Sequence, residues 1–166
     1  MKKYSFAFFV LCLVLVSFFA VTSYATTTAT VAATVTVQNV SVTASDGTVG
    51  YGTLATNASA GTNGSDTQTA TNNGNIAEDL NIKGQNTATW TLGSSAGSDQ
   101  YVHKFCTASC TSAPTNYTAL TTNYQTLGSN VAASGTQTFD LYITTPTSSS
   151  SYSQQSVDVT VQAVAH

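Results

Sequence analysis

The sequence predicts an all-β protein, and three observations lead to this fold class. Short runs of alternating apolar and polar residues recur along the chain, turn residues separate them at fairly regular intervals, and helical periodicity is almost absent. Each run is expected to form a strand with one apolar face, and two sheets must pack together to bury those faces. We therefore expect an Ig-like or jelly-roll β-sandwich of seven to eight strands.

The first 25 residues have the pattern of a secretory signal peptide. Two lysines precede an apolar run over 6–21, and Ser23 and Ala25 supply the small side chains that a signal peptidase recognises. A retained membrane anchor is the alternative, but the run is shorter than the roughly 18 to 20 apolar residues of a spanning helix. The expected organisation is a signal peptide over 1–25 and one secreted domain over 26–166.

The composition limits the partners that this chain can have. Charged residues make up 7% of the sequence, where soluble proteins have about 25%. Once a signal peptide is removed, only Lys83 and Lys104 remain as bases against seven acidic residues, which argues against nucleic acid and anionic membranes as partners. A surface of hydroxyl and amide groups carries little repulsion, so we expect self-association with identical subunits.

A long alternating stretch over 30–44 opens the domain. Its apolar residues follow one phase up to Val37 and the other phase from Val40, so the strand changes face at Gln38-Asn39. No charge, Pro or Gly protects its first half from pairing with another chain, so residues 26–37 are either a donor strand for a neighbouring subunit or the first strand of their own domain. The apolar side chains of this assembly strand are Val31, Ala33, Val35 and Val37.

Several shorter strands follow in the middle of the chain. The pattern predicts a strand beginning at Val49, a short edge strand over 67–71 within a polar loop region, and core strands over 76–83, 87–92 and 101–105. The inward side chains of the core strands are Ile76, Leu80, Ile82, Ala88, Trp90, Leu92, Tyr101, His103 and Phe105.

One stretch departs from the period of two. Tyr117, Leu120, Tyr124 and Leu127 are spaced as on a helix face, but the threonines and asparagines among them disfavour a stable helix. We expect a loop with one helical turn over the end of the sandwich.

A β-hairpin near the C-terminus is the clearest element. The strand over 138–144 places Phe139, Leu141 and Ile143 on one face and Asp140 on the solvent face, and Pro146 ends it. A serine-rich loop leads to a second strand over 156–163, which we expect to pair with the first. Its inward residues are Val157, Val159, Val161 and Ala163.

The strongest candidate for a chemical site is the cluster of His103, Cys106 and Cys110. One His and two Cys are three of the four ligands that zinc prefers, and copper also accepts them, but no fourth ligand is evident. In an exported chain with two cysteines after the signal peptide, a local disulfide between Cys106 and Cys110 is the favoured interpretation.

Catalytic residues are scarce. The only histidines are His103 and the terminal His166, and neither lies near a nucleophile motif. The carboxylates of Glu78 and Asp79 are adjacent on a strand and therefore point to opposite faces. We expect no enzymatic activity and no cofactor.

Glycans enter the prediction in two ways. Six tyrosines, together with Trp90 as a less favoured platform, suggest a carbohydrate-binding module as the alternative function, since aromatic faces stack on sugar rings. The tyrosines are Tyr51, Tyr101, Tyr117, Tyr124, Tyr142 and Tyr152. The possible glycosylation sites are Asn39, Asn57, Asn63 and Asn116.

The order of these features resembles prokaryotic secreted surface sandwiches. The long valine-threonine first strand, the motifs Val49-Gly50-Tyr51-Gly52 and Asn72-Asn73-Gly74-Asn75, the segment 135–141 and the closing strand over 152–161 are similar to camelysin/TasA-type biofilm fibre proteins and to spore coat U/secreted-pilin proteins. The chain departs from the second group in lacking an early cysteine. The resemblance implies an extracellular fibre, pilus or coat subunit that assembles by β-strand exchange.

Overall fold

The computed structural model describes residues 27–45 and 47–166. The chain divides after Thr36, so residues 27–36 and the folded unit over 37–166 are described separately. The expected signal peptide over 1–25 lies outside the described residues.

Two β-sheets build the folded unit, and its described residues contain no helix, which confirms the all-β fold. The strands are β1 (Val42–Ala44), β2 (Ser59–Gly61), β3 (Gln68–Asn72), β4 (Glu78–Lys83), β5 (Thr91–Leu92), β6 (Gln100–Cys106), β7 (Thr118–Ala119), β8 (Gln125–Val131), β9 (Thr136–Thr144) and β10 (Thr160–Ala165). Ten strands are described where seven to eight were expected, and two of the ten contain only two residues.

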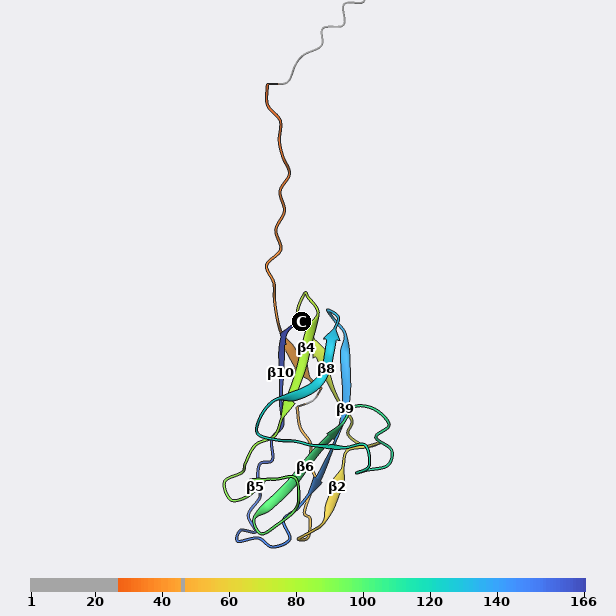
Figure 1. Cartoon of the computed structure of the whole chain (residues 1–166), viewed down its shortest axis with the longest axis vertical. Helices are drawn as coiled ribbons and strands as arrows, with labels where there is room; N and C mark the ends of the chain where they lie inside the picture. The colour runs from red at the N-terminus through yellow and green to blue at the C-terminus, as the bar shows by residue number, and fades with distance from the viewer. Residues whose placement is uncertain (1–26, 46) are drawn as a thin grey trace, which may run out of the picture. The chain divides into compact units, whose positions relative to one another are not determined.

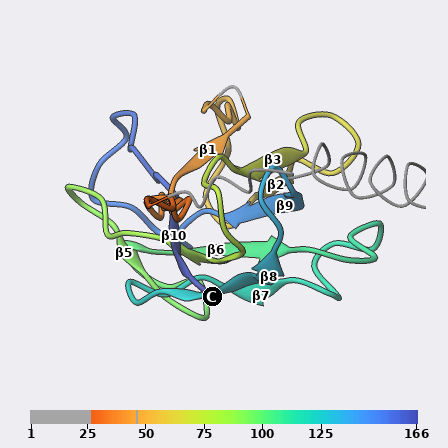
Figure 2. The same ribbon diagram turned by 90° about the horizontal axis from the view of Figure 1, so that it is seen from above.

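The larger sheet has seven strands in the order β1-β3-β9-β6-β5, with β2 also paired to β9 and β7 also paired to β6. It curls from β1 through β3 and β9 to β6 (Figure 2). The smaller sheet has the order β10-β4-β8, and its three strands lie side by side in Figure 1. This arrangement is sandwich-like.

The core forms where the apolar faces of both sheets meet. On β9 the alternation buries Phe139, Leu141 and Ile143, as expected, and on β4 it buries Leu80 and Ile82. The core cluster consists of Ala70, Leu80, Ile82, Phe105, Leu120, Leu127, Phe139 and Leu141.

The predicted C-terminal hairpin is wrong, although both of its strands have the expected inward faces. β9 pairs with β3, β2 and β6, whereas β10 pairs antiparallel with β4 in the other sheet. Alternation determines which face of a strand is buried but not which edge it pairs with. The intervening loop therefore crosses from one sheet to the other.

Three further predictions need correction. The strand over 67–71 is not an edge strand, because β3 lies between β1 and β9. Only Thr91–Leu92 of the expected strand over 87–92 is a strand, and Trp90 precedes it. The expected helical turn is absent, and β7 and β8 occupy this stretch instead. The buried Leu120 and Leu127 therefore belong to two strand regions joined by a turn. In that turn the hydroxyl of Thr121 donates to the carbonyl of Asn123.

The predicted strand over 30–44 is much shorter in the structure. Only β1 forms, and the preceding residues 37–41 instead hydrogen-bond to the turn around Asn73-Gly74. Asn75 makes three hydrogen bonds to this segment. Its backbone N–H donates to the carbonyl of Asn39, its side-chain oxygen accepts the N–H of Asn39, and its side-chain amide donates to the carbonyl of Val37. These contacts begin at Val37, next to Gln38-Asn39, where the alternation of apolar residues changes from one face to the other.

Gly74 permits this close contact between the turn and residues 37–41. A side chain at this position would collide with the carbonyl oxygen of Asn39 and with the carboxylate of Glu78. Glu78 is fully buried, and its Oε1 accepts the N–H of Ser41 at 2.8 Å. Hydrogen bonds thus attach residues 37–41, which we call the anchored segment, to the folded unit.

Candidate functional site: an open groove in the sandwich

The folded unit contains an open groove of about 1330 Å³. Its floor is the inner face of β9, where Phe139, Leu141 and Ile143 point into it. One wall is the segment 47–56 and the other is the segment 151–159, which leads into β10. The groove therefore has an apolar floor, while its walls mix apolar side chains with threonine, serine and glutamine.

Both walls lack strand pairing. Among the described residues, the backbones of 49–54 and 154–159 make no backbone-to-backbone hydrogen bond, and neither stretch belongs to a strand. Val49, Tyr51 and Leu54 are half-buried, while the glycines between and beside them are exposed. Unpaired backbone N–H and carbonyl groups form a template for another strand. Each wall supplies such a template along the groove.

The groove also separates two open sheet edges. In the described structure β1 pairs only with β3, and β10 pairs only with β4. Val42 of β1 and Val161 of β10 both line the groove. The Cα atoms of β1 and β10 nevertheless approach within 8 Å, so room for one more strand lies along the unpaired walls and not directly between these two strands.

A polar contact lies within this apolar site. The hydroxyl of Tyr51 lies 2.8 Å from Nε2 of His103, and the two rings meet edge to face with centroids 5.6 Å apart. Tyr101 stands on the other side of the imidazole, with centroids 6.3 Å apart, and Trp90 follows Tyr101 at 6.1 Å. Tyr51, His103 and Trp90 line the groove, whereas Tyr101 is fully buried behind it.

Burial controls the ionisation of this contact. His103 is 1% exposed, and the loss of hydration lowers its pKa to about 4 because burial disfavours the charged imidazolium. The backbone of Val157 opposes part of this shift, yet Nδ1 has no partner within hydrogen-bonding distance and angle. Burial, with the charge of Asp66 second, also raises the pKa of Tyr51 well above its usual range. Both groups are therefore neutral at neutral pH.

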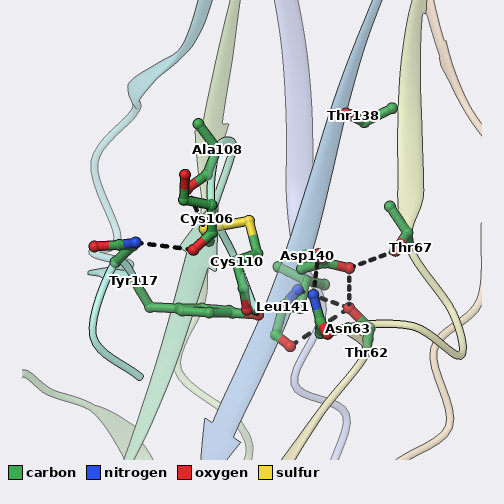
Figure 3. Close-up of a disulfide and its surroundings, with 12 residues drawn as sticks. Thr62, Asn63, Thr67, Cys106, Ala108, Cys110, Tyr117, Thr138, Asp140 and Leu141 are labelled. Carbon is green, nitrogen blue, oxygen red and sulfur yellow. Dashed lines mark hydrogen bonds between the residues drawn. A yellow bond between two sulfur atoms is a disulfide. The ribbon is translucent and has the colours of Figure 1, made fainter. Parts of the chain in front are cut away.

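Cys106 and Cys110 form a disulfide, which confirms the favoured interpretation. Their Cα atoms are 5.7 Å apart, and the bridge closes the chain just after β6 (Figure 3). The bond occupies both sulfur atoms, and the imidazole of His103 contacts Tyr51 instead of the sulfurs. In the described part of the chain no three His, Cys, Asp or Glu side chains are grouped as metal ligands.

A buried carboxylate on β9 was missed by the sequence analysis, which placed Asp140 on the solvent face. Asp140 is 5% exposed and accepts hydrogen bonds from the hydroxyls of Thr62 and Thr67 and from the amide of Asn63 (Figure 3). Thr62 also accepts the N–H of Leu141 at 2.8 Å. The polar loop over 62–67 therefore covers the outer face of β9. No local pattern signals this contact, because the partners are more than 70 residues apart.

The predicted assembly strand belongs to no strand in the structure. Residues 27–36 are extended, and Val31 and Val35 are 89% and 92% exposed. Ala33 is also exposed, and Val37, at 83% exposure, starts the anchored segment described above. The alternating apolar side chains of this segment are thus available to a partner.

The predicted glycan-related residues are scattered. All four possible glycosylation sites, Asn39, Asn57, Asn63 and Asn116, are exposed. Of the six tyrosines, Tyr101 and Tyr117 are buried, Tyr142 packs on Tyr117 with centroids 5.7 Å apart, and Tyr124 lies under the ammonium of Lys83. Tyr152 is largely exposed on the loop before β10. The tyrosine side chains therefore do not gather into one platform.

Comparison with protein-family models, with curated proteins and with solved structures finds no match to this chain. The described residues contain no helix long and apolar enough to cross a membrane.

Proposed function

We propose that this protein is an extracellular structural or adhesive surface subunit that assembles into a fibre, pilus or coat by β-strand exchange. The observation that carries this proposal is that one chain contains both an exposed strand-like segment and a groove that could accept such a segment. Residues 27–36 are an exposed, alternating, uncharged stretch outside every sheet, and the folded unit has an apolar groove between unpaired strand-like walls. A strand with one apolar face and a groove that lacks a strand stabilise each other by burying apolar surface and pairing backbone groups.

Charge and compartment support the same proposal. A surface in which charged residues are only 7% of the sequence lets identical subunits pack without strong repulsion. The disulfide is compatible with an oxidising extracellular compartment. The predicted leader over 1–25 would bring the chain there.

Carbohydrate binding has less support as the alternative function. A sugar platform needs aromatic faces that are exposed and close together. The tyrosines are dispersed between core, sheet surface and loops, as described above, and the indole of Trp90 donates to the hydroxyl of Ser149 at the end of the groove. A glycan array with the purified protein distinguishes the two functions.

The decisive experiment compares assembly of the full exported protein with a variant lacking residues 26–36. Negative-stain microscopy and sedimentation are expected to detect fibres or large oligomers of the full protein, and folded monomers of the variant. The double variant Val31→Thr/Val35→Thr should also remain monomeric, since threonine keeps the strand tendency but removes apolar area.

The matched control is Thr30→Ser/Thr34→Ser, which alters the opposite phase of the same segment and should assemble normally. If the full protein remains monomeric at every concentration tested, the proposed function is wrong.

A further inference from the structure

We infer that the groove is the acceptor site for residues 31–36 of a second copy of this chain, which insert between the two walls with His103 as their hydrogen-bonding anchor. This inference rests on the proposed function and specifies where on the folded unit the exchanged strand binds.

The dimensions of the groove match this occupant. The unpaired part of the second wall, 154–159, and the alternating segment over 31–36 are each six residues long, which at about 3.3 Å per residue corresponds to roughly 20 Å of strand. The apolar floor of the groove is formed by Phe139, Leu141 and Ile143. Val31, Ala33 and Val35 are small apolar residues in one phase, and they can lie on the floor formed by β9.

Backbone groups of the second wall face the groove in a regular order. The N–H of His166 donates to the carbonyl of Ala77, which continues the β10–β4 ladder by one residue. Because the bonding direction alternates in an antiparallel pair, the backbone groups of Gln162 and Thr160 also point toward β4. Those of Val161 and Val159 therefore point away from β4, toward the open edge. An inserted strand can pair there and become the fourth strand of the smaller sheet.

His103 gives the site its polar centre. Its imidazole lines the groove and is 1% exposed, and its Nδ1 is a buried polar atom without a hydrogen-bond partner. A buried polar group that lacks a partner destabilises the folded state, because it has lost its hydration without gaining a hydrogen bond. A backbone group of the inserted strand can remove this cost, because the neutral ring can either donate or accept at Nδ1 according to its tautomer. Tyr51 keeps the ring oriented by binding the other nitrogen.

The occupant comes from a second copy because of how the segment is joined to the folded unit. The side chain of Asn75 holds the segment at the turn before β4, since its amide donates to the carbonyl of Val37 and its oxygen accepts the N–H of Asn39. The anchored segment separates the part that is exchanged from the part that stays with its own fold. This division suits a strand that completes a neighbour while its own groove receives the segment of another subunit.

Photo-crosslinking of the full exported protein tests the location. A diazirine-bearing amino acid replaces Ala33, and subunits labelled with 14N and 15N are mixed before assembly and irradiation. The expected result is mixed-isotope crosslinks from position 33 to residues 48–54 or 154–159.

Crosslinks to other surfaces in a protein that still assembles would overturn the acceptor site and leave the proposed function standing. Crosslinks only within one subunit would overturn both, as would the absence of any assembly.

The anchor role is tested with two ring-conserving variants. His103→Phe removes both ring nitrogens, and the concentration needed for half-maximal assembly should rise about fivefold, as expected for the loss of one hydrogen bond. Tyr51→Phe removes only the hydroxyl and leaves Nδ1 in place, so this concentration should change less than twofold. Equal effects of the two variants, or no effect of His103→Phe in a folded protein, would overturn the anchor role.

A second measurement needs no variant. In the full protein with 15N-labelled histidine, the Nδ1 resonance should shift on assembly and show contacts to backbone atoms of residues 31–36. An unchanged Nδ1 resonance in assembled protein would overturn the anchor role even if His103→Phe failed to fold.

Discussion

The floor of the groove and its wall over 154–159 have the same alternating sequence pattern but differ in strand pairing and in burial. On the floor, β9 pairs on both edges and Leu141 is 4% exposed. In the wall over 154–159, Val157 and Val159 point inward in the same way, yet they are half-buried and make no backbone-to-backbone hydrogen bond. The difference shows that alternation of apolar and polar residues gives a segment one apolar face, whereas forming a strand also requires backbone hydrogen bonds to a neighbouring strand.

The C-terminal segment shows both situations within one run of sequence. Residues 156–163 alternate without interruption, but only those from Thr160 onward pair with β4. β4 ends at Lys83, opposite Thr160, so the wall has no neighbour to pair with. Residues 156–159 therefore have the alternating pattern of a strand but no neighbouring strand on either edge.

Truncation of the floor should have the largest effect on stability. Leu141→Ala leaves a cavity among well-packed neighbours and should lower the free energy of unfolding by about 2 to 5 kcal/mol. Val157→Ala in the wall removes fewer and half-exposed methyl groups and should cost about 1 kcal/mol or less. Urea unfolding of the unassembled protein measures both. Similar costs would show that the wall is as tightly packed as the floor.

Acidification should destabilise the folded unit through His103, which lies on β6. The unfolded chain takes up a proton near pH 6.5, but the folded protein does so only near pH 4, because burial lowers the pKa of His103. Stability is therefore complete above pH 6.5 and should fall by about 3 kcal/mol as the pH drops to 4. Urea unfolding across this window measures the slope.

His103→Phe provides the control for the pH dependence. The slope between pH 6.5 and 4 should largely disappear in this variant, while the ion pair between His166 and Asp79 remains the same in both proteins. The pKa of Asp79 is lowered by its hydrogen bonds to the Asn130 backbone and to His166, so its contribution to stability is lost only at more acidic pH. An equal slope in the variant would assign the pH dependence to other groups.

Proline substitutions compare β10, which pairs with β4, with the unpaired wall over 154–159. Of the changes in stability predicted here, these are expected to be the smallest. Gln162→Pro removes an N–H that points toward β4, and the loss of that ladder bond should cost about 1 kcal/mol or more. Gln154→Pro, at an exposed position in the wall, removes no backbone hydrogen bond and should leave stability nearly unchanged. Thermal unfolding measures both. A comparable loss from Gln154→Pro would mean that the wall is paired in solution.

The sequence by itself determined the fold class, the inward faces and the disulfide. Phe139, Leu141 and Ile143 are buried as their alternation predicts, and so are Tyr101, His103 and Phe105 on β6. These features depend on neighbours along the chain, because side chains in a strand alternate with a period of two whatever their partner. The disulfide joins cysteines four positions apart, so it too is a local feature.

Only the tertiary structure decided which edges meet and which stay open. The pairing of β10 with β4 instead of β9, the burial of Asp140 under residues 62–67 and the contact between Tyr51 and His103 all join residues that are distant in sequence. The groove arises from the absence of a strand between two walls, and no residue pattern encodes that absence directly. Edge pairing depends on register and on burial summed over many long-range contacts, and these are established only when the whole chain has folded.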